Sequence, residues 1–359
     1  MAKTESKTLN GIIETCIAQK LPFVFYRLPG KTEVHFMAEV PGGTIKASEA
    51  PGFMFNPFLR NEKTPAVFIR KDTHFELHLE DLTSVKINID DICGEDLVNV
   101  KATREEFCDQ VKKAVKTIHK GVLEKVILSR VEKATVKEKN PAAIFTELCI
   151  KYSTAFVSLV VIPGKTVWLT ASPELLVSLE GDRVKSVALA GTKPANKNIP
   201  WGEKEKDEQQ MVTDYVYTVL INNCIDVQTS GPDEVIAGNI AHLKTEFSGT
   251  LNTGMYQILS DLHPTPAVCG LPRDKALDFI METEKHQRKY YTGYLGPCNM
   301  NGKTEWYVNL RCAELFSDRA NLFVGGGITA DSDPEKEWNE TIMKAQTLLN
   351  VIAPTIKIV

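Results

Sequence analysis

The sequence lacks any apolar run that approaches the roughly 20 residues of a membrane span. Its first residues, MAKTESKTLN, also lack the apolar centre of a secretory signal peptide. The formal net charge of −4 shows no strong excess of either sign, which argues against nucleic acid or an anionic membrane as a partner. We therefore expect a cytoplasmic protein that attracts any anionic substrate through local groups.

Motifs of several common site types are missing as well. The eight cysteines include no CxxC pair and have no histidine at ligand spacing, so we expect reduced core residues in place of a zinc or redox site. The glycine motifs of dinucleotide-binding and P-loop proteins and the nucleophile elbow of α/β-hydrolases are absent. The chain also shows no internal repeat and no low-complexity run.

Short β-type runs fill the first part of the chain, and helices follow it. Residues 1–103 are predicted to be a strand-rich scaffold half, with strands at 23–28, 34–40, 53–58, 66–69 and 75–79. Capping signals predict helices at 104–120, after Thr103 and Glu106, and at 141–152, after Asn140. Further strands are predicted at 156–162, 166–170, 175–179, 184–189, 289–296 and 305–315, and a long helix follows a polar loop at 194–200. This order favours an α+β fold of packed sheets, whereas the length of 359 residues alone would suggest two domains.

The segment 321–344 combines a candidate anion site with a candidate cation site. An apolar strand is predicted to end at Val324 and to enter a turn of glycines at 325–327, which would expose backbone N–H groups to a ligand. On the helix that follows Asp333-Pro334, three side chains share one face: Glu337, Glu340 and Lys344. Two carboxylates there could hold a hard cation. The alternative is a solvated Glu/Lys face after a flexible loop.

Four other residues are candidates for chemistry or substrate binding. Lys125 lies in an apolar strand, where a neutral amine could act as a general base, although the side chain could instead reach an edge and stay charged. Glu174 enters a strand of leucines, and burial would make it a proton donor. Arg311 would need a partner if buried, and a substrate carboxylate would serve. Glu208 could face inward or could simply complement the helix dipole, and His263 is expected to be structural.

Nine segments resemble, in order and spacing, motifs of the chorismate-utilising enzyme family: EKVILSR, ASPELL, ALAGT, EKDEQQ, LHPTPAVCG, YTGYLG, NLRCAEL, FVGGGI and EWNET. The resemblance is close over 104–350 and loose over the first hundred residues. It implies one large α+β domain, 1–359, made of two facing, mainly antiparallel sheets with helices outside and the active site between the sheets. It thereby replaces the two-domain expectation.

Within the family the chain looks most similar to isochorismate synthases, isomerases that use Mg²⁺ to add water at C2 of chorismate and remove the C4 hydroxyl. Lys125 matches the base and Glu174 the acid. Glu208 and Glu340 match the magnesium ligands, with Glu337 close by and acting through water. The substrate-binding positions implied are Gly191, Thr192, His242, Ala267, Val268, Tyr291, Arg311, Gly326, Gly327 and Lys344.

Single positions separate the branches of the family. Ammonia-using relatives carry glutamine at Lys125, the aminodeoxychorismate branch often carries lysine at Ala190, and salicylate synthases tend to carry threonine at Ala267. Gln209 departs from the usual histidine after the metal-binding glutamate, a change that would tune the surroundings of the metal at most. The alternatives are a salicylate synthase and a non-catalytic protein that binds an anionic metabolite. The product could serve menaquinone or catechol siderophore synthesis, and we expect a monomer in preference to a dimer.

Overall fold

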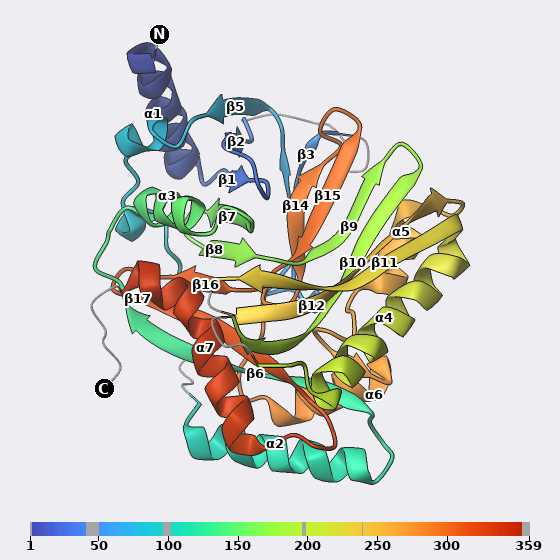
Figure 1. Ribbon diagram of the computed structural model, residues 1–359. Coiled ribbons are helices and arrows are strands. Elements are labelled where there is room, and N and C mark those ends of the chain that lie inside the picture. Colours follow the sequence, from blue (N-terminus) through green and yellow to red (C-terminus); the bar gives the residue numbers. More distant parts are fainter. Residues whose placement is uncertain (1, 41–49, 96–101, 196–198, 239, 354–359) are drawn as a thin grey trace.

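The computed structural model describes residues 2–40, 50–95, 102–195, 199–238 and 240–353. Two antiparallel sheets face each other in one α+β domain, as the sequence predicted, and their strands run in crossing directions (Figure 1). In spatial order the nine-stranded sheet contains β13 (Gly270–Leu271), β6 (Lys125–Thr135), β17 (Arg319–Ile328), β16 (Cys312–Leu315), β8 (Thr166–Ser172), β7 (Phe156–Ile162), β1 (Phe23–Arg27), β2 (Val34–Ala38) and β5 (Thr73–Leu77). The eight-stranded sheet contains β11 (Cys224–Ala237), β12 (Ile240–Leu251), β10 (Arg183–Pro194), β9 (Leu175–Glu180), β15 (Lys303–Val308), β14 (Tyr294–Cys298), β3 (Gly52–Asn56) and β4 (Val67–Arg70).

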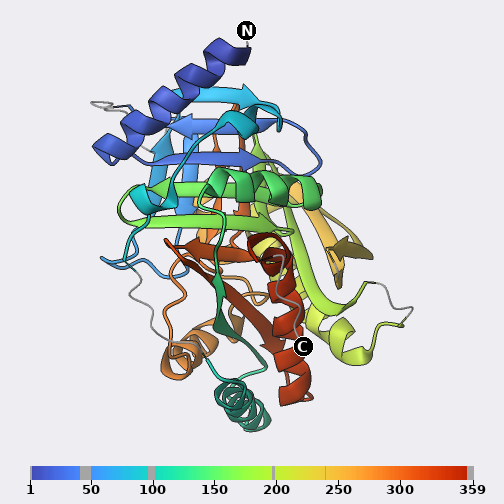
Figure 2. The same cartoon turned by 90° about the vertical axis from the view of Figure 1, so that its left-hand side faces the viewer.

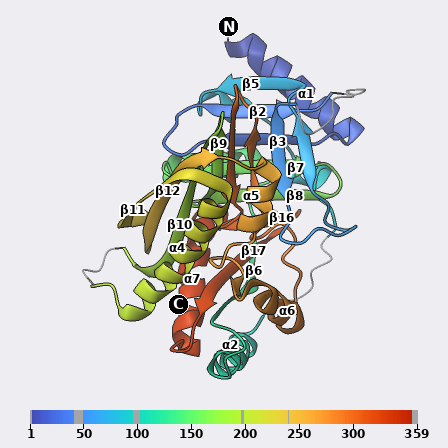
Figure 3. The same cartoon turned by 90° about the vertical axis from the view of Figure 1, so that its right-hand side faces the viewer.

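Helices cover the outer faces of the sheets. They are α1 (Ala2–Gln19), α2 (Arg104–His119), α3 (Pro141–Lys151), α4 (Glu203–Asn223), α5 (Met255–Leu262), α6 (Arg273–Thr283) and α7 (Pro334–Ile352), with short 3₁₀ turns η1 (Asp81–Ser84) and η2 (Ile89–Asp91). Helix α3 packs on β7, and α7 packs on β17 beside α2 (Figure 2). Helix α4 lies along β10 and β12 of the other sheet (Figure 3). No helix within the described ranges is long and apolar enough to cross a membrane.

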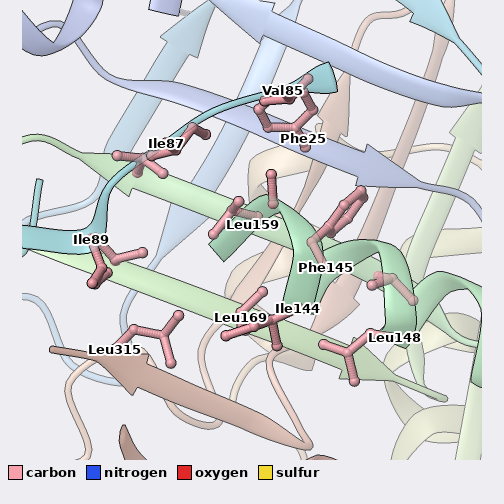
Figure 4. Packing of buried hydrophobic residues seen from close by; sticks show 14 of the residues in the cluster. Phe25, Val85, Ile87, Ile89, Ile144, Phe145, Leu148, Leu159, Leu169 and Leu315 are labelled. Atoms are coloured by element: carbon pink, nitrogen blue, oxygen red, sulfur yellow. The ribbon is translucent and has the colours of Figure 1, made fainter. Parts of the chain in front are cut away.

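Strand β1 shows why the core has separate layers. All five of its residues are buried, and successive side chains point to opposite faces of the sheet. Phe23 and Phe25 enter the outer layer under α3, whereas Val24 and Tyr26 enter the layer between the two sheets. In the outer layer, side chains of α3 lie over Leu159 and Leu169 (Figure 4). Burial on both faces makes this strand central to both layers.

The capping signals correctly predicted three helix starts. Thr103 and Glu106 form the predicted capping box of α2, Asn140 caps α3, and Asp333 caps α7. The elements that were not predicted include α1, α5, α6 and β11. Helix α1 buries Leu9, Ile13 and Cys16 at helical spacing, a signal weakened by Gly11. Strand β11 is largely exposed and is held by its pairing with β12, so it carries no hydrophobic alternation that the sequence could reveal.

Two predicted strands had wrong boundaries. The run at 289–296 becomes a strand only at Tyr294, because Lys289 and Thr292 adopt positive φ angles of 52° and 60°, which an extended strand excludes. The run at 305–315 is split into β15 and β16. Between them Arg311 has φ 47°, at the point where the chain passes from one sheet to the other.

Candidate active site

A cavity between the two sheets collects the predicted substrate-binding residues. Its wall contains all ten of them together with Glu174 and Glu208: Gly191, Thr192, His242, Ala267, Val268, Tyr291, Arg311, Gly326, Gly327 and Lys344. Pro173, Leu310 and Phe323 also line the cavity and were not predicted. Two of the wall segments are crossings between the sheets, from β8 to β9 and from β15 to β16. The crossings place Glu174 and Arg311 at the cavity.

Glu174 is a buried acid in the wall of this cavity. Pro173 and Glu174 lie between β8 and β9, and the backbone of Glu174 is fixed on both sides. Its N–H donates to Ser172 Oγ at 3.3 Å, and its carbonyl accepts the N–H of Val308 at 3.0 Å. Burial raises the pKa of Glu174 to about 8, against the opposing positive charges of Lys125, Arg311 and Lys344. At neutral pH the group is mainly protonated and can donate a proton.

Arg311 and His242 form a hydrogen-bonded pair in the cavity wall, a cation beside a neutral imidazole. Burial lowers the pKa of His242 to about 3, so the ring is neutral at physiological pH. Its Nδ1 lies 2.8 Å from the carbonyl oxygen of Gly191 and therefore carries the proton, which leaves Nε2 to accept from Arg311 Nη2 at 3.1 Å. Arg311 Nη1 is buried and has no hydrogen-bond partner among the described residues. A buried guanidinium with an unused donor fits an anionic ligand.

The glycines at 325–327 are not in a turn, which corrects the prediction for this segment. They continue β17 and pair with Ser129, Leu128 and Ile127 of β6, so much of their backbone belongs to the sheet. Because these glycines lack a Cβ, neighbouring side chains can lie close to the strand. A Cβ at Gly327 would lie 2.2 Å from Glu208 Oε1 and 3.0 Å from Lys125 Cε, and a Cβ at Gly325 would lie 2.8 Å from the Tyr291 hydroxyl. The glycines let side chains approach the strand closely.

Lys125 is the first residue of β6 and is fully buried. Its Nζ lies 2.9 Å from Glu208 Oε1, so the two residues predicted as base and metal ligand are direct neighbours. The alternative in which the lysine reaches a solvent-exposed edge is therefore wrong. Glu208 likewise faces the cavity and does more than complement the helix dipole.

The three predicted metal ligands each have a lysine partner. Besides the Glu208–Lys125 pair, Glu340 Oε1 lies 2.6 Å from Lys344 Nζ, which also donates to the carbonyl of Gly325 at 2.9 Å. Glu337 is 1% exposed, and its Oε1 lies 2.5 Å from Lys204 Nζ, a residue that the sequence prediction missed. The alternative of a solvated Glu/Lys face is therefore wrong.

The ammonium group of Lys204 contacts Glu337 and is also attracted by the charges of Glu208 and Glu340. Burial acts to lower its pKa, but Glu337, followed by Glu208 and Glu340, raises it above the ordinary value. Burial and the charge of Glu340 raise the pKa of Glu337. Burial also acts to raise the pKa of Glu340, but Lys344 holds it below its ordinary value. An acidic cluster at the start of α4 could have suggested a compensating lysine one turn before Glu208.

The chemistry of the donor set suits a hard divalent cation, although the carboxylate oxygens of the three glutamates do not all lie within 4.8 Å of one another. Gly326 leaves room for Glu340 and Glu337, whose carboxylate oxygens would lie 3.4 Å and 3.6 Å from an added Cβ, and Gly327 leaves room for Glu208. Carboxylate oxygens of this kind are the ligands that Mg²⁺ prefers. Each carboxylate has a lysine partner, so a bound cation would take over contacts that lysines now make.

Two further predictions concern residues beside the site. Gln209 does not point to the carboxylates: its Oε1 accepts from the N–H of Ala190 at 2.8 Å, and its Nε2 donates to Ala188 O and Thr245 Oγ1, each at 3.1 Å. It joins α4 to β10 and β12. His263 is structural, as expected, because its Nε2 lies 2.9 Å from the carbonyl of Thr292.

Comparisons with known proteins identify the family. Residues 90–353 match the family model described as chorismate binding enzyme. The vibriobactin-specific isochorismate synthase of Vibrio cholerae is 32% identical over 260 residues, which cover 68% of this chain and 66% of the relative. The isochorismate synthase EntC of Escherichia coli is 32% identical over 243 residues, or 64% of this chain and 62% of the relative. The matches thus span slightly less than two thirds of the length of these relatives.

A solved structure shows the same fold over almost the whole chain. MenF, the menaquinone-specific isochorismate synthase of Escherichia coli, superposes with a TM-score of 0.76 at 21% identity, covering 92% of this chain and 88% of that one. The family match extends over most of the chain and contains every residue of the cavity wall. The chain therefore belongs to the chorismate-binding enzyme family.

Proposed function

We propose that the protein is an isochorismate synthase, which isomerises chorismate to isochorismate. One observation carries the proposal: a protonated, buried Glu174 and an unpartnered guanidinium nitrogen of Arg311 line the same cavity. Chorismate is a dianion with a leaving hydroxyl, so it needs both cationic anchors and a proton donor. The similarity to relatives named isochorismate synthase supports this choice of reaction.

Lys125 and Glu174 divide the proton transfers in this proposal. Lys125 takes a proton from water while the water oxygen bonds to C2. The ring double bonds shift, the C4–oxygen bond breaks, and Glu174 gives its proton to the departing hydroxyl, which leaves as water. One water enters and one leaves, so the product is an isomer of the substrate. General acid–base catalysis of this kind typically contributes about 10²- to 10⁴-fold.

The anchors for the substrate carboxylates would be Arg311 and Lys344. Arg311 Nη1 has no protein partner among the described residues, whereas its Nη2 is held by His242 and so keeps the guanidinium in a fixed orientation. Lys344 reaches the cavity wall from α7. Glu208 and Glu340 would hold Mg²⁺, with Glu337 nearby, and the bound ion would neutralise charge on a substrate carboxylate.

The first test is the product profile from chorismate, resolved by chromatography with and without Mg²⁺. We expect isochorismate alone, and only with the metal. Salicylate together with pyruvate would instead assign the protein to the salicylate synthases and overturn the interpretation of Ala267, which lines the cavity beside Val268. Binding of chorismate without turnover would support the anionic-metabolite-binding alternative.

Two variants test the assigned residues. Lys125→Ala and Glu174→Gln should each lower kcat by roughly 10²- to 10⁴-fold. Circular dichroism should show that both variants remain folded. Lys185→Ala, an exposed lysine on β10, is the control and should keep full activity. Retained turnover in Lys125→Ala would remove this lysine from the mechanism.

A further inference from the structure

Three potential metal ligands meet at the edge of the nine-stranded sheet, away from the cavity. Strands β2 and β5 are neighbours at the edge of the sheet (Figure 1). Their register places His35 opposite Glu76 and Met37 opposite His74. His74 and Glu76 are two residues apart on one strand, so their side chains share a face. His35 lies on that same face because it is the cross-strand partner of Glu76. A separation of 39 positions along the chain hides the cluster from sequence motifs.

The ligand atoms already lie close together. His35 Nδ1 is 3.1 Å from His74 Nε2 and 3.9 Å from Glu76 Oε1, and the two imidazole rings are within 12° of parallel. Within the described ranges this is the one group of three His, Cys, Asp or Glu residues whose ligand atoms all fall within 4.8 Å of one another. The stack of Tyr26 on His35, with ring centroids 4.8 Å apart, fixes the orientation of that imidazole.

These distances match those of a metal centre. Two bonds of about 2.0–2.1 Å from Zn²⁺ to imidazole nitrogens at a tetrahedral angle place the nitrogens about 3.3 Å apart. The observed 3.1 Å needs almost no adjustment. Glu76 Oε1 must move closer to His35 Nδ1 by roughly half an ångström for a bond of similar length, and the side chain of Glu76 is 66% exposed.

Each ring turns one nitrogen toward the other, His35 Nδ1 toward His74 Nε2 at 3.1 Å. In the metal-free protein the two facing nitrogens share one proton. Moving that proton to an outward-facing nitrogen frees a lone pair on each ring without loss of neutrality.

We propose that His35, His74 and Glu76 bind a first-row transition-metal cation such as Zn²⁺, which fastens the edge strand β5 to β2. Two imidazoles and one carboxylate suit Zn²⁺ and not Mg²⁺, which demands oxygen ligands. Three protein ligands leave a fourth position for water. The site is separate from the carboxylates of the cavity.

The test is a calorimetric titration of the full chain with Zn²⁺ in the presence of excess Mg²⁺, which occupies the hard-oxygen site. We expect one Zn²⁺ per chain and a higher Tm in its presence, because an ion that binds only the folded state stabilises it. Loss of a residue that merely hydrogen-bonds a metal ligand weakens metal binding by roughly 10- to 100-fold. His74→Gln and Glu76→Gln remove ligands themselves, so each should weaken Zn²⁺ binding by at least this factor. His119→Gln, an exposed histidine at the end of α2, is the control and should bind as the wild type does.

The Glu76→Gln variant keeps the test decisive even if a histidine variant is unstable, because its side chain is exposed. Co²⁺ provides an independent readout, since ligation by two imidazoles gives visible absorption that the variants should lose. Unchanged Zn²⁺ affinity in both His74→Gln and Glu76→Gln would overturn the proposal, as would failure of the wild type to bind Zn²⁺. In either case the two histidines form only a structural hydrogen bond.

Discussion

At the scale of single residues, burial of the Glu174 carboxyl lowers the stability of the fold at neutral pH but keeps the group protonated, as a general acid requires. Its pKa rises from an ordinary 4.5 to about 8 because the charged form loses its hydration. The folded protein therefore binds a proton at pH values where the unfolded chain has released it. Linkage then requires the free energy of unfolding to fall as pH rises from about 4.5 to about 8.

Glu174→Gln should remove this pH dependence. Glutamine resembles the protonated acid in shape and cannot ionise, so the variant should match the wild type near pH 4.5 and become progressively more stable than it up to about pH 8. The difference should reach the order of a few kcal/mol, since one unit of pKa shift corresponds to about 1.4 kcal/mol. Urea unfolding at a series of pH values measures it. A stability difference that does not change with pH would contradict the assignment.

Adjacent glycines in β17 offer a matched pair of variants. Gly327→Ala puts a methyl group 2.2 Å from Glu208 Oε1, so the carboxylate must leave its position while the strand itself can persist. We expect a loss of about 10²-fold in kcat/KM, the typical cost of misplacing a reacting group by about 1 Å. Gly326→Ala meets carboxylate oxygens only at 3.4 Å and beyond, and should lose much less.

The comparison of the two glycine variants needs activity assays and circular dichroism on both proteins. Equal losses in the two would show that β17 needs glycine for its backbone and not for the approach of Glu208. Neither residue has a positive φ, so strain does not confuse the comparison.

At the scale of elements, α4 and α7 meet through charges of opposite sign. Lys204 on α4 contacts Glu337 on α7 and is attracted by Glu208 and Glu340. Because its ammonium group faces the same carboxylates that would hold Mg²⁺, lysine and metal compete. Lys204→Met should therefore bind Mg²⁺ more tightly, by roughly tenfold for each 1.4 kcal/mol of competition removed, and should be less stable without the metal.

Calorimetric Mg²⁺ titration and thermal unfolding check the Lys204 prediction. Lys206→Met is the control, since Lys206 lies on the same helix and pairs with the exposed Glu203. Weaker Mg²⁺ binding in Lys204→Met than in Lys206→Met would mean that the lysine supports the metal site instead of competing with it.

Elements with strong local signals could be predicted from the sequence, and those fixed by distant contacts could not. The caps of α2, α3 and α7 depend on neighbouring residues and were predicted correctly. The ten substrate-binding residues implied by the family motifs all lie in the cavity wall. The extended glycines of β17 depend on pairing with β6, and the position of Arg311 depends on a crossing between sheets. The pairing of Lys204 with Glu337 joins residues 133 positions apart, so no local pattern identifies Glu337 as the partner of this lysine.

At the scale of the whole molecule, the first hundred residues are built into both sheets. Strand β1 pairs with β7 in the nine-stranded sheet, and β3 pairs with β14 in the eight-stranded sheet. The layer between the sheets likewise joins Phe53 and Phe55 to Trp168 and Tyr307 from later strands. The motif-bearing part of the chain therefore depends on the first part for its core.

A fragment of residues 104–359 should fail to fold although it contains every predicted site residue. Without β1 and β3, the strands β7 and β14 would expose unpaired backbone groups and the apolar side chains that now pack between the sheets. We expect aggregation or loss of the cooperative urea transition shown by the full chain, and recovery of chorismate turnover when residues 1–103 are co-expressed as a separate chain. A fragment 104–359 that unfolds cooperatively and retains activity would show instead that the first hundred residues are dispensable to the core.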